Sequence, residues 1–354
     1  MPSVKNTVSD FRWPAILTVL GLIAGGWLNG VQGFLVVATL APLEISVSFD
    51  NAVLNAAVLR NWNSAWRAVF MRVGLPIAVI GMRLLFPLAI VAVLGHVSLV
   101  DAAKMAVLDP KQYANVLQSS HREIAAFGGA FLLMVFWEFM LNVEKDSHWL
   151  RFIEQPLSKA GKIGKLDVFL TLGILAITTM FVADEERLSF VFAGISGVMS
   201  FVAAHGLGSA LQGDDEEAAE GSGGEVAKAF VKQGLLGLLY LETLDASCSF
   251  DGVIGALAIS DNIFLIAIGL GIGAAYVRKL TLLLVENDSL QAYRYLEHGA
   301  FWAIGALGAL MFVGVVHEVP EVVTGLLGVA SIACAVWSSL RANKAEQRAA
   351  VAAQ

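Results

Sequence analysis

Long apolar stretches separated by short polar segments run along the chain from residue 13 to residue 340. A helix needs about 20 apolar residues to cross the roughly 30 Å hydrocarbon core of a bilayer, and in lipid every backbone polar group must be satisfied internally. The pattern predicts an all-α fold, a polytopic transmembrane helical bundle of about ten helices. The expected spans are approximately 13–30, 31–59, 66–95, 123–142, 166–183, 188–211, 228–260, 262–285, 296–316 and 320–340.

The composition agrees with a protein surface that meets lipid. Apolar residues make up 57% of the chain and charged residues 15%, and the mean hydropathy is +0.71. Much of the net charge of −7 lies in one acidic loop, 213–227, which is typical of a solvated linker. Two cysteines, Cys248 and Cys334, supply neither a disulfide framework nor a thiolate metal cluster, and we expect Cys248 to pack in the interior.

Basic residues near the expected helix ends divide unevenly between the two faces of the bundle. Lys and Arg are retained on the cytoplasmic side of a membrane. The face with more basic residues includes both ends of the chain, so we expect both termini to be cytoplasmic. The poorer face carries only Lys104, Lys111, Arg122 and Arg187. The chain then divides into a first transmembrane half, 1–142, a basic cytoplasmic loop, 143–165, a second transmembrane half, 166–340, and a cytoplasmic tail, 341–354.

Polar residues inside the apolar spans reveal an internal duplication. The segment Leu43-Glu-Ile-Ser-Val-Ser-Phe-Asp50 aligns with Leu244-Asp-Ala-Ser-Cys-Ser-Phe-Asp251, with the acids in register. Downstream, Arg83 aligns with Arg278 after one gap of six residues. The two motifs lie in the second and seventh spans, five positions apart, and an odd offset predicts opposite orientations in the bilayer and therefore an inverted internal repeat.

The motif helices are expected to be broken near their acids. Pro42 precedes the first acid cluster and Gly252 follows the second, and both residue types loosen a helix. Glu44 and Asp50 are six residues apart, which places them on different faces of an ideal helix. Local unwinding would turn both carboxylates inward, toward a site near the midplane at the repeat interface.

The intramembrane acids form an oxygen-rich set that suits a hard cation. An ionisable residue at membrane depth costs on the order of 2.5–3.5 kcal/mol on insertion scales, so several together indicate a function. Oxygen donors are typical ligands of magnesium, calcium and manganese, whereas zinc and copper favour histidine or thiolate. We expect metal ligation by Glu44, Asp50, Asn51, Glu242, Asp245 and Asp251, with Ser48 and Ser249 as supporting ligands.

Arg83 and Arg278 allow two interpretations. Both can form buried salt bridges with the acids that merely hold the two halves together. Alternatively, they serve as internal counter-charges that occupy the acids when no ion is bound. Five carboxylates face only two arginines, and a bound cation would balance the remaining negative charge. The excess of acids therefore favours the second interpretation.

Other polar residues carry weaker signals. His298 can relay protons, although a lone histidine near a membrane interface is more often a polar anchor. Asp261-Asn262 closes the seventh span and can either line the ion path or cap the start of the eighth helix, and we favour the cap. No catalytic residues are expected, since a membrane metal hydrolase needs an activated water with histidine or paired acids near an interface, and only His298 offers that.

These motifs resemble the TerC family of membrane proteins, named from tellurium resistance, and in particular a branch long carried as a domain of unknown function. The resemblance rests on Leu43-Glu44 with Asp50-Asn51, on Glu242, Asp245 and Asp251 followed by Ala258-Ile259-Ser260-Asp261, and on one arginine in each following helix. It covers roughly residues 33–95 and 234–316. Gly252-Val-Ile-Gly255 departs from the Ser and nearby Pro that are usual in the family.

The resemblance implies a bacterial inner-membrane protein that exports manganese, with the motif acids as metal ligands and protons as a possible counter-ion. It also implies a bundle related to the LysE-type exporters, whose members move other cargo, so the fold alone does not fix the substrate. We expect Mn²⁺ as the transported substrate, with Ca²⁺ or another divalent cation as an alternative, and no nucleic-acid partner.

Two further interpretations stay open at this point. A carrier for an oxyanion would need basic ligands, which the acid excess disfavours. A membrane scaffold would instead bind soluble partners through the 143–165 loop and the tail that begins at Arg341, and could act in tellurium or metal stress resistance. The scaffold interpretation predicts that the intramembrane acids are dispensable.

Overall fold

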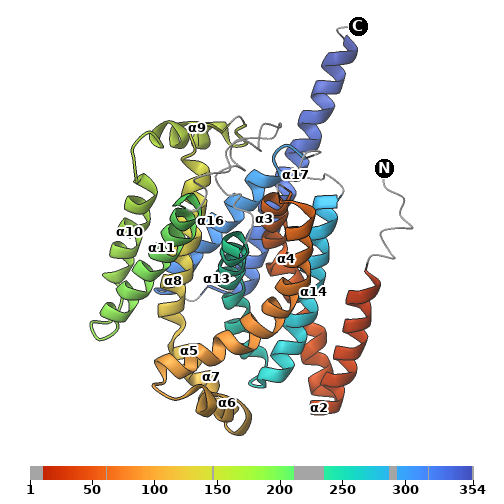
Figure 1. Cartoon of the computed structure of the whole chain (residues 1–354), viewed down its shortest axis with the longest axis vertical. Helices are drawn as coiled ribbons and strands as arrows, with labels where there is room; N and C mark the ends of the chain where they lie inside the picture. Colours follow the sequence, from red (N-terminus) through yellow and green to blue (C-terminus); the bar gives the residue numbers. More distant parts are fainter. Residues whose placement is uncertain are drawn as a thin grey trace.

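The computed structural model describes residues 11–60, 62–145, 147–210, 235–286, 293–317 and 319–352, and the side chains of Phe250 and Asp251 lie outside that description. Every regular element in these ranges is a helix (Figure 1). The first half contains α2 (Arg12–Val47), α3 (Phe49–Leu59), α4 (Ser64–Pro76), η1 (Ile77–Leu85), α5 (Phe86–Leu94), α6 (Leu99–Leu108), α7 (Pro110–Ser119) and α8 (His121–Met140). The second half contains α9 (Arg151–Ala160), α10 (Leu166–Thr179), α11 (Arg187–Ala210), α13 (Leu235–Ile259), α14 (Ile263–Glu286), α16 (Leu296–Gly314) and α17 (Glu321–Ala352).

The predicted all-α transmembrane bundle is confirmed. In the described part of the chain, six helices are long and apolar enough to cross a membrane. Large apolar side chains stay exposed along α2, α10 and α17, as expected of a surface covered by lipid; Trp27, for example, is 85% exposed. The acidic 213–227 loop falls outside the described residues.

Several predicted spans differ from the observed helices. The 31–59 span is interrupted at Ser48, and the 166–183 span contains a helix of only 14 residues, α10. Two short helices, α6 and α7, fill the segment between the third and fourth spans, where no helix was predicted. Helix α17 continues through the expected tail to Ala352, and its last part projects from one end of the bundle (Figure 1).

The first helix folds back on itself at Asn29 and Gly30. Gly30 has φ +59° and ψ −147°, a conformation open only to glycine, and the limbs of α2 on either side run next to each other (Figure 1). A Cβ atom at Gly25 would lie 2.8 Å from the Gly33 carbonyl oxygen and 2.8 Å from the Val37 side chain. Small residues therefore permit a tight hairpin at the predicted boundary between the first two spans.

The third span runs from α4 through η1 into α5 and contains a π-helix. The Phe86 N–H donates to the carbonyl of Gly81, five residues back rather than four. Pro76 and Pro87, at the two ends of this segment, lack the N–H groups that would continue a regular α-helical ladder. The π-helix changes the direction in which its side chains point, and Arg83 lies within it.

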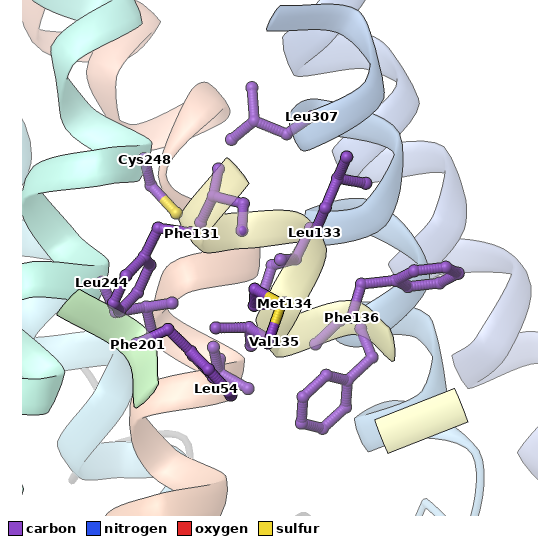
Figure 2. Packing of buried hydrophobic residues seen from close by; sticks show 14 of the residues in the cluster. Leu54, Phe131, Leu133, Met134, Val135, Phe136, Phe201, Leu244, Cys248 and Leu307 are labelled. Carbon is purple, nitrogen blue, oxygen red and sulfur yellow. The ribbon is translucent and has the colours of Figure 1, made fainter. Parts of the chain in front are cut away.

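The largest apolar cluster joins the two halves of the chain around α8. Phe131 on α8 lies next to Leu244 and Cys248 of α13 and to Phe201 of α11 (Figure 2). Phe131 and Phe201 meet edge to face, with ring centroids 5.9 Å apart. Cys248 is buried in this cluster, as predicted, and the packing fixes α13 and its acids against the centre of the bundle.

A second buried centre attaches α9 to the bundle. Glu154 is fully buried and accepts hydrogen bonds from Lys145 Nζ (2.9 Å), Trp302 Nε1 (3.1 Å) and the backbone N–H of Trp149 (3.2 Å). His298 Nδ1 lies 3.0 Å from the same carboxylate. His298 is thus a buried anchor of α9 on α16, and we name this set, Lys145, Glu154, His298 and Trp302, the Glu154 cluster.

We predict that Gly33→Ala destabilises the hairpin of α2, because its Cβ would run into the Gly25 carbonyl. Overpacking of this kind costs about 1–3 kcal/mol. Thermal unfolding of the purified full-length protein in detergent should give a lower Tm than that of the wild type. Gly26→Ala is the matched control, since its Cβ would meet nothing closer than Phe34 Cβ at 4.0 Å. Equal Tm values for the two variants would contradict the close approach.

We predict that Glu154→Gln destabilises the protein by about 3–5 kcal/mol, because Lys145 would be left buried without its counter-charge. Burial by itself raises the pKa of Glu154, but the hydrogen bond and charge of His298, followed by those of Lys145, outweigh burial and hold this pKa below its ordinary value.

A group with a lowered folded-state pKa stabilises the protein above its unfolded-state pKa, and that contribution is lost as the pH falls. The stability gap between wild type and Glu154→Gln should therefore narrow below about pH 4.3. Glu144→Gln, at an exposed position in the connection between α8 and α9, serves as the control, and its stability should match that of the wild type. A gap that stays constant with pH would refute the role of this carboxylate's charge.

Candidate functional site: a buried carboxylate and arginine centre

The first motif is broken between its two acids. Helix α2 ends at Val47, Ser48 leaves the helical conformation with φ −95° and ψ 14°, and α3 begins at Phe49. The Ser48 hydroxyl donates to Glu44 Oε1 (2.9 Å). The predicted break is therefore present in the first repeat, whereas Pro42 lies within α2. The expected loosening at Gly252 is wrong, since α13 continues through it from Leu235 to Ile259.

The two motifs cross in opposite directions. Asn51 Nδ2 donates to Asp245 Oδ1, and at the other end of the crossing a Cβ at Gly252 would lie 3.2 Å from Glu44 Oε2. In the alignment of the repeats, Glu44 corresponds to Asp245 and Asn51 to Gly252. Exchanging the repeats therefore converts one contact into the other. This reciprocity is the geometry of a two-fold relation, and it agrees with the predicted inverted repeat.

Each arginine pairs with an acid of its own repeat. Arg83 Nη2 donates to Glu44 Oε1, and Arg278 Nη2 lies 3.4 Å from Glu242 Oε1. Glu44 and Arg83 are each only 1% exposed, so their mutual charge neutralisation takes place away from solvent. Breaking a buried pair of this kind by removing one partner leaves an uncompensated charge, which is strongly unfavourable.

Two glycines leave space for the charged side chains, and one aromatic ring packs against the Arg278 guanidinium. A Cβ at Gly74 would collide with the Arg278 guanidinium, and one at Gly273 would collide with the Glu44 side chain. The Arg278 guanidinium also lies over the ring of Phe70, with its Cζ 3.9 Å from the ring centroid. The close approach of α14 to α2 and α4 thus depends on missing side chains at these positions.

A small cavity lies beside the ion pairs. Its free volume is about 10 Å³, room for about one water molecule. Five segments contribute its lining: Glu44 and Ser48 from the break, Asn55 from α3, Arg83 from η1, Asp245 from α13, and Ala274, Val277, Arg278 and Thr281 from α14. The cavity is therefore a meeting point of both repeats.

Several buried oxygens around this cavity have no hydrogen-bond partner. In the described part of the chain these are Oδ1 of Asn51 and Asn55, Oε2 of Glu242 and Oδ2 of Asp245. Every one of them is an acceptor, and buried acceptors without partners are costly unless a donor or a cation satisfies them. The arrangement therefore leaves buried acceptor oxygens that a donor or a cation would satisfy.

The structure brings together most, but not all, of the predicted ligands. Asp50 is buried yet does not line the cavity; its Oδ2 faces Gly328 of α17, and its Oδ1 accepts from the backbone N–H of Asn51 (2.9 Å). Ser249 is also buried outside the cavity lining, with an unpartnered hydroxyl. Asp251 lies on α13, and its side chain is outside the described part.

Among the described residues, no group of three or more His, Cys, Asp or Glu side chains is arranged to hold a metal. The physical reason is visible in the ion pairs: Arg83 and Arg278 hold Glu44 and Glu242, while Asp50 turns toward α17. Asp50 and Asp245 take part in no ion pair among the described side chains. The five predicted ligands whose side chains are described therefore do not form a ready coordination shell in this conformation.

Sequence reasoning missed two cavity residues, Asn55 and Thr281. Asn55 lies four residues after Asn51 and hence on the same face of α3, a spacing that could have identified it. Thr281 is fully buried three residues after Arg278, but its hydroxyl donates to the Val277 carbonyl (3.0 Å), and its sequence context gives no signal. The predicted cap at Asn262 is confirmed, because its side chain accepts from Phe264 N (3.0 Å) and Leu265 N (3.3 Å).

Fold and site together define an all-α membrane protein with a buried centre of carboxylates, amides and arginines at the crossing of two repeated motifs. The chain belongs to a family described as a protein of unknown function (DUF475), whose model matches residues 49–346. No curated protein and no solved structure matches the chain.

Proposed function

We propose that the protein moves a divalent metal cation, manganese foremost, across the membrane through the buried centre at the motif crossing. We name this centre, Glu44, Asn51, Asn55, Arg83, Glu242, Asp245 and Arg278, the carboxylate and arginine centre. The observation that carries this proposal is the group of unpartnered buried oxygens at the crossing of the motifs, from Asn51, Asn55, Glu242 and Asp245, of which Asn55 and Asp245 line the cavity. These are hard oxygen donors, which suit Mn²⁺, Ca²⁺ and Mg²⁺. Manganese, export and the bacterial inner membrane come from the resemblance to the TerC family, and cytoplasmic termini come from the distribution of basic residues.

The arginines give the proposed site a way to stay neutral without its ion. In the observed conformation Arg83 and Arg278 occupy Glu44 and Glu242, and the cavity admits only about one water molecule. Cation binding would then require at least one arginine to withdraw from its acid, so binding is coupled to a movement of η1 or α14. Such coupling is what alternating access at a repeat interface needs.

A membrane scaffold remains the alternative from a different class. The projecting end of α17, which is held to the start of α16 by the Arg294 and Glu346 pair (2.9 Å), supplies a surface for a soluble partner. That alternative gives the buried centre no task beyond stability. It predicts that conservative changes at the centre leave metal handling unchanged.

The decisive experiment measures Mn²⁺ and Ca²⁺ flux into proteoliposomes that contain the full-length protein. Asp245→Asn keeps the shape of the side chain and removes its charge, so we predict a loss of flux of about tenfold or more, the size that follows changes around a metal ligand. Asp101→Asn, at an exposed acid of α6, is the control and should match the wild type.

Wild-type flux no greater than that of protein-free liposomes, for both ions, would reject transport of these ions. Wild-type flux that survives in Asp245→Asn would keep transport but reject the centre as its site. Elemental analysis of cells that express the same variants after metal challenge gives an independent measurement of export.

We further predict that Arg83→Gln lowers the apparent KM for Mn²⁺ and lowers the maximal flux, each several-fold, because Glu44 loses the cation that competes with the metal. Arg83→Lys, which keeps the charge, should recover part of the flux. Arg122→Gln removes an exposed pair with Glu186 and serves as the control. Unchanged KM and flux in a folded Arg83→Gln protein would show that the arginine is not a counter-charge.

A further inference from the structure

Helix α9 lies across one end of the bundle, at a large angle to α8 and α10, which it connects (Figure 1). Its inner side is fixed by Glu154, which belongs to the Glu154 cluster, and by Ser158, whose hydroxyl donates to the Asn142 carbonyl (2.8 Å). The two residues are four apart and so occupy one face. The opposite face of α9 is consequently held in a defined direction, away from the bundle.

That outward face combines apolar and basic side chains. Phe152 is 77% exposed and Lys159 is exposed beside it, about two turns further along the same face. The turn that follows α9 continues the pattern with Ile163, 61% exposed, between Lys162 and Lys165. We name this surface, Arg151, Phe152, Lys159, Lys162, Ile163 and Lys165, the α9 platform.

No acidic side chain among the described residues balances the charge of the platform. The only acid in residues 151–165 is Glu154, and it points inward to the Glu154 cluster. None of the four basic side chains of the platform forms an ion pair among the described residues. Asp167, in the first turn of α10, is the nearest acid in the sequence after the platform. Four exposed basic side chains thus lie around two exposed apolar side chains.

We propose that the α9 platform is a binding surface for the headgroups of anionic phospholipids in the surrounding bilayer. The helix connects the ends of two neighbouring helices of the bundle, which places it at the level where a hydrocarbon core gives way to headgroups. At that depth an apolar side chain inserts among acyl chains while lysines reach phosphate groups. Clustered basic residues next to membrane spans bind acidic lipid in this way.

A soluble acidic protein is the competing occupant, and the apolar residues argue against it. Phe152 and Ile163 alternate with the bases along the surface rather than forming a separate patch, as in amphipathic helices that lie in an interface. The proposal stands apart from metal transport, since it uses none of the residues of the carboxylate and arginine centre.

The test compares retention of phosphatidylglycerol and phosphatidylcholine on the purified full-length protein by native mass spectrometry, with free lipid titrated. The wild type should retain more phosphatidylglycerol than phosphatidylcholine. The amount of phosphatidylglycerol retained should fall as the salt concentration rises. Each lysine is expected to contribute at most about fivefold to the affinity for phosphatidylglycerol. The triple variant Lys159→Gln, Lys162→Gln and Lys165→Gln should therefore bind phosphatidylglycerol at least about tenfold more weakly than the wild type. All three sites are exposed, so folding should be unaffected.

Lys104→Gln with Lys111→Gln is the matched control, since these exposed lysines lie on α6 and α7 at the opposite end of the bundle (Figure 1). It should leave the preference intact. Phe152→Ser tests the apolar contribution and should weaken retention of both lipids. Equal retention of the two lipids by the wild type, or unchanged retention in the triple variant, would overturn the proposal. Tighter binding of a polyglutamate peptide than of phosphatidylglycerol would reassign the platform to an acidic protein partner.

Discussion

The pairing of Glu44 with Arg83 inside the membrane is the interaction to which the rest of the bundle is adjusted. Neither charge is solvated there, so each must lie within hydrogen-bonding distance of the other, and the backbone changes shape to allow it. The break at Ser48 turns the end of α2 and adds a hydroxyl donor to Glu44. On the other side, the π-helix between Pro76 and Pro87 sets the direction of Arg83.

The crossing of the two motifs explains how a single duplicated segment builds a shared centre. Because the repeats run in opposite directions, Asn51 meets Asp245 at one end while Glu44 meets Gly252 at the other. The relation is not a perfect symmetry, since the first motif is broken and α13 is continuous. A site whose two halves differ in this way has unequal neighbours on its two sides, and the transport proposed above would use that inequality to open toward one side at a time.

Sequence reasoning captured what depends on hydrophobic periodicity and on rare intramembrane polar residues. The all-α bundle, the boundary near Gly30, the break near Glu44 and the presence of Asn51 and Asp245 in one buried site all follow from such signals. It did not find the π-helix, because the effect of two prolines on hydrogen-bond register depends on what α4 and α5 pack against. Nor did it find that Asp50 turns toward Gly328, since a one-residue break decides which face a neighbouring acid occupies.

The two buried ionic centres of this protein differ in how completely their polar atoms are hydrogen-bonded. Glu154 receives donors from a lysine, a tryptophan ring and the backbone, and its histidine partner completes the shell, so nothing further is needed to stabilise it. The centre at the repeat crossing contains Asn55, Glu242 and Asp245, each with an acceptor oxygen left unpartnered. Buried polar networks stabilise a fold only when every member is satisfied. The Glu154 cluster meets that condition and holds a helix in place, whereas the centre at the crossing leaves acceptor oxygens unpartnered, which a bound cation would satisfy.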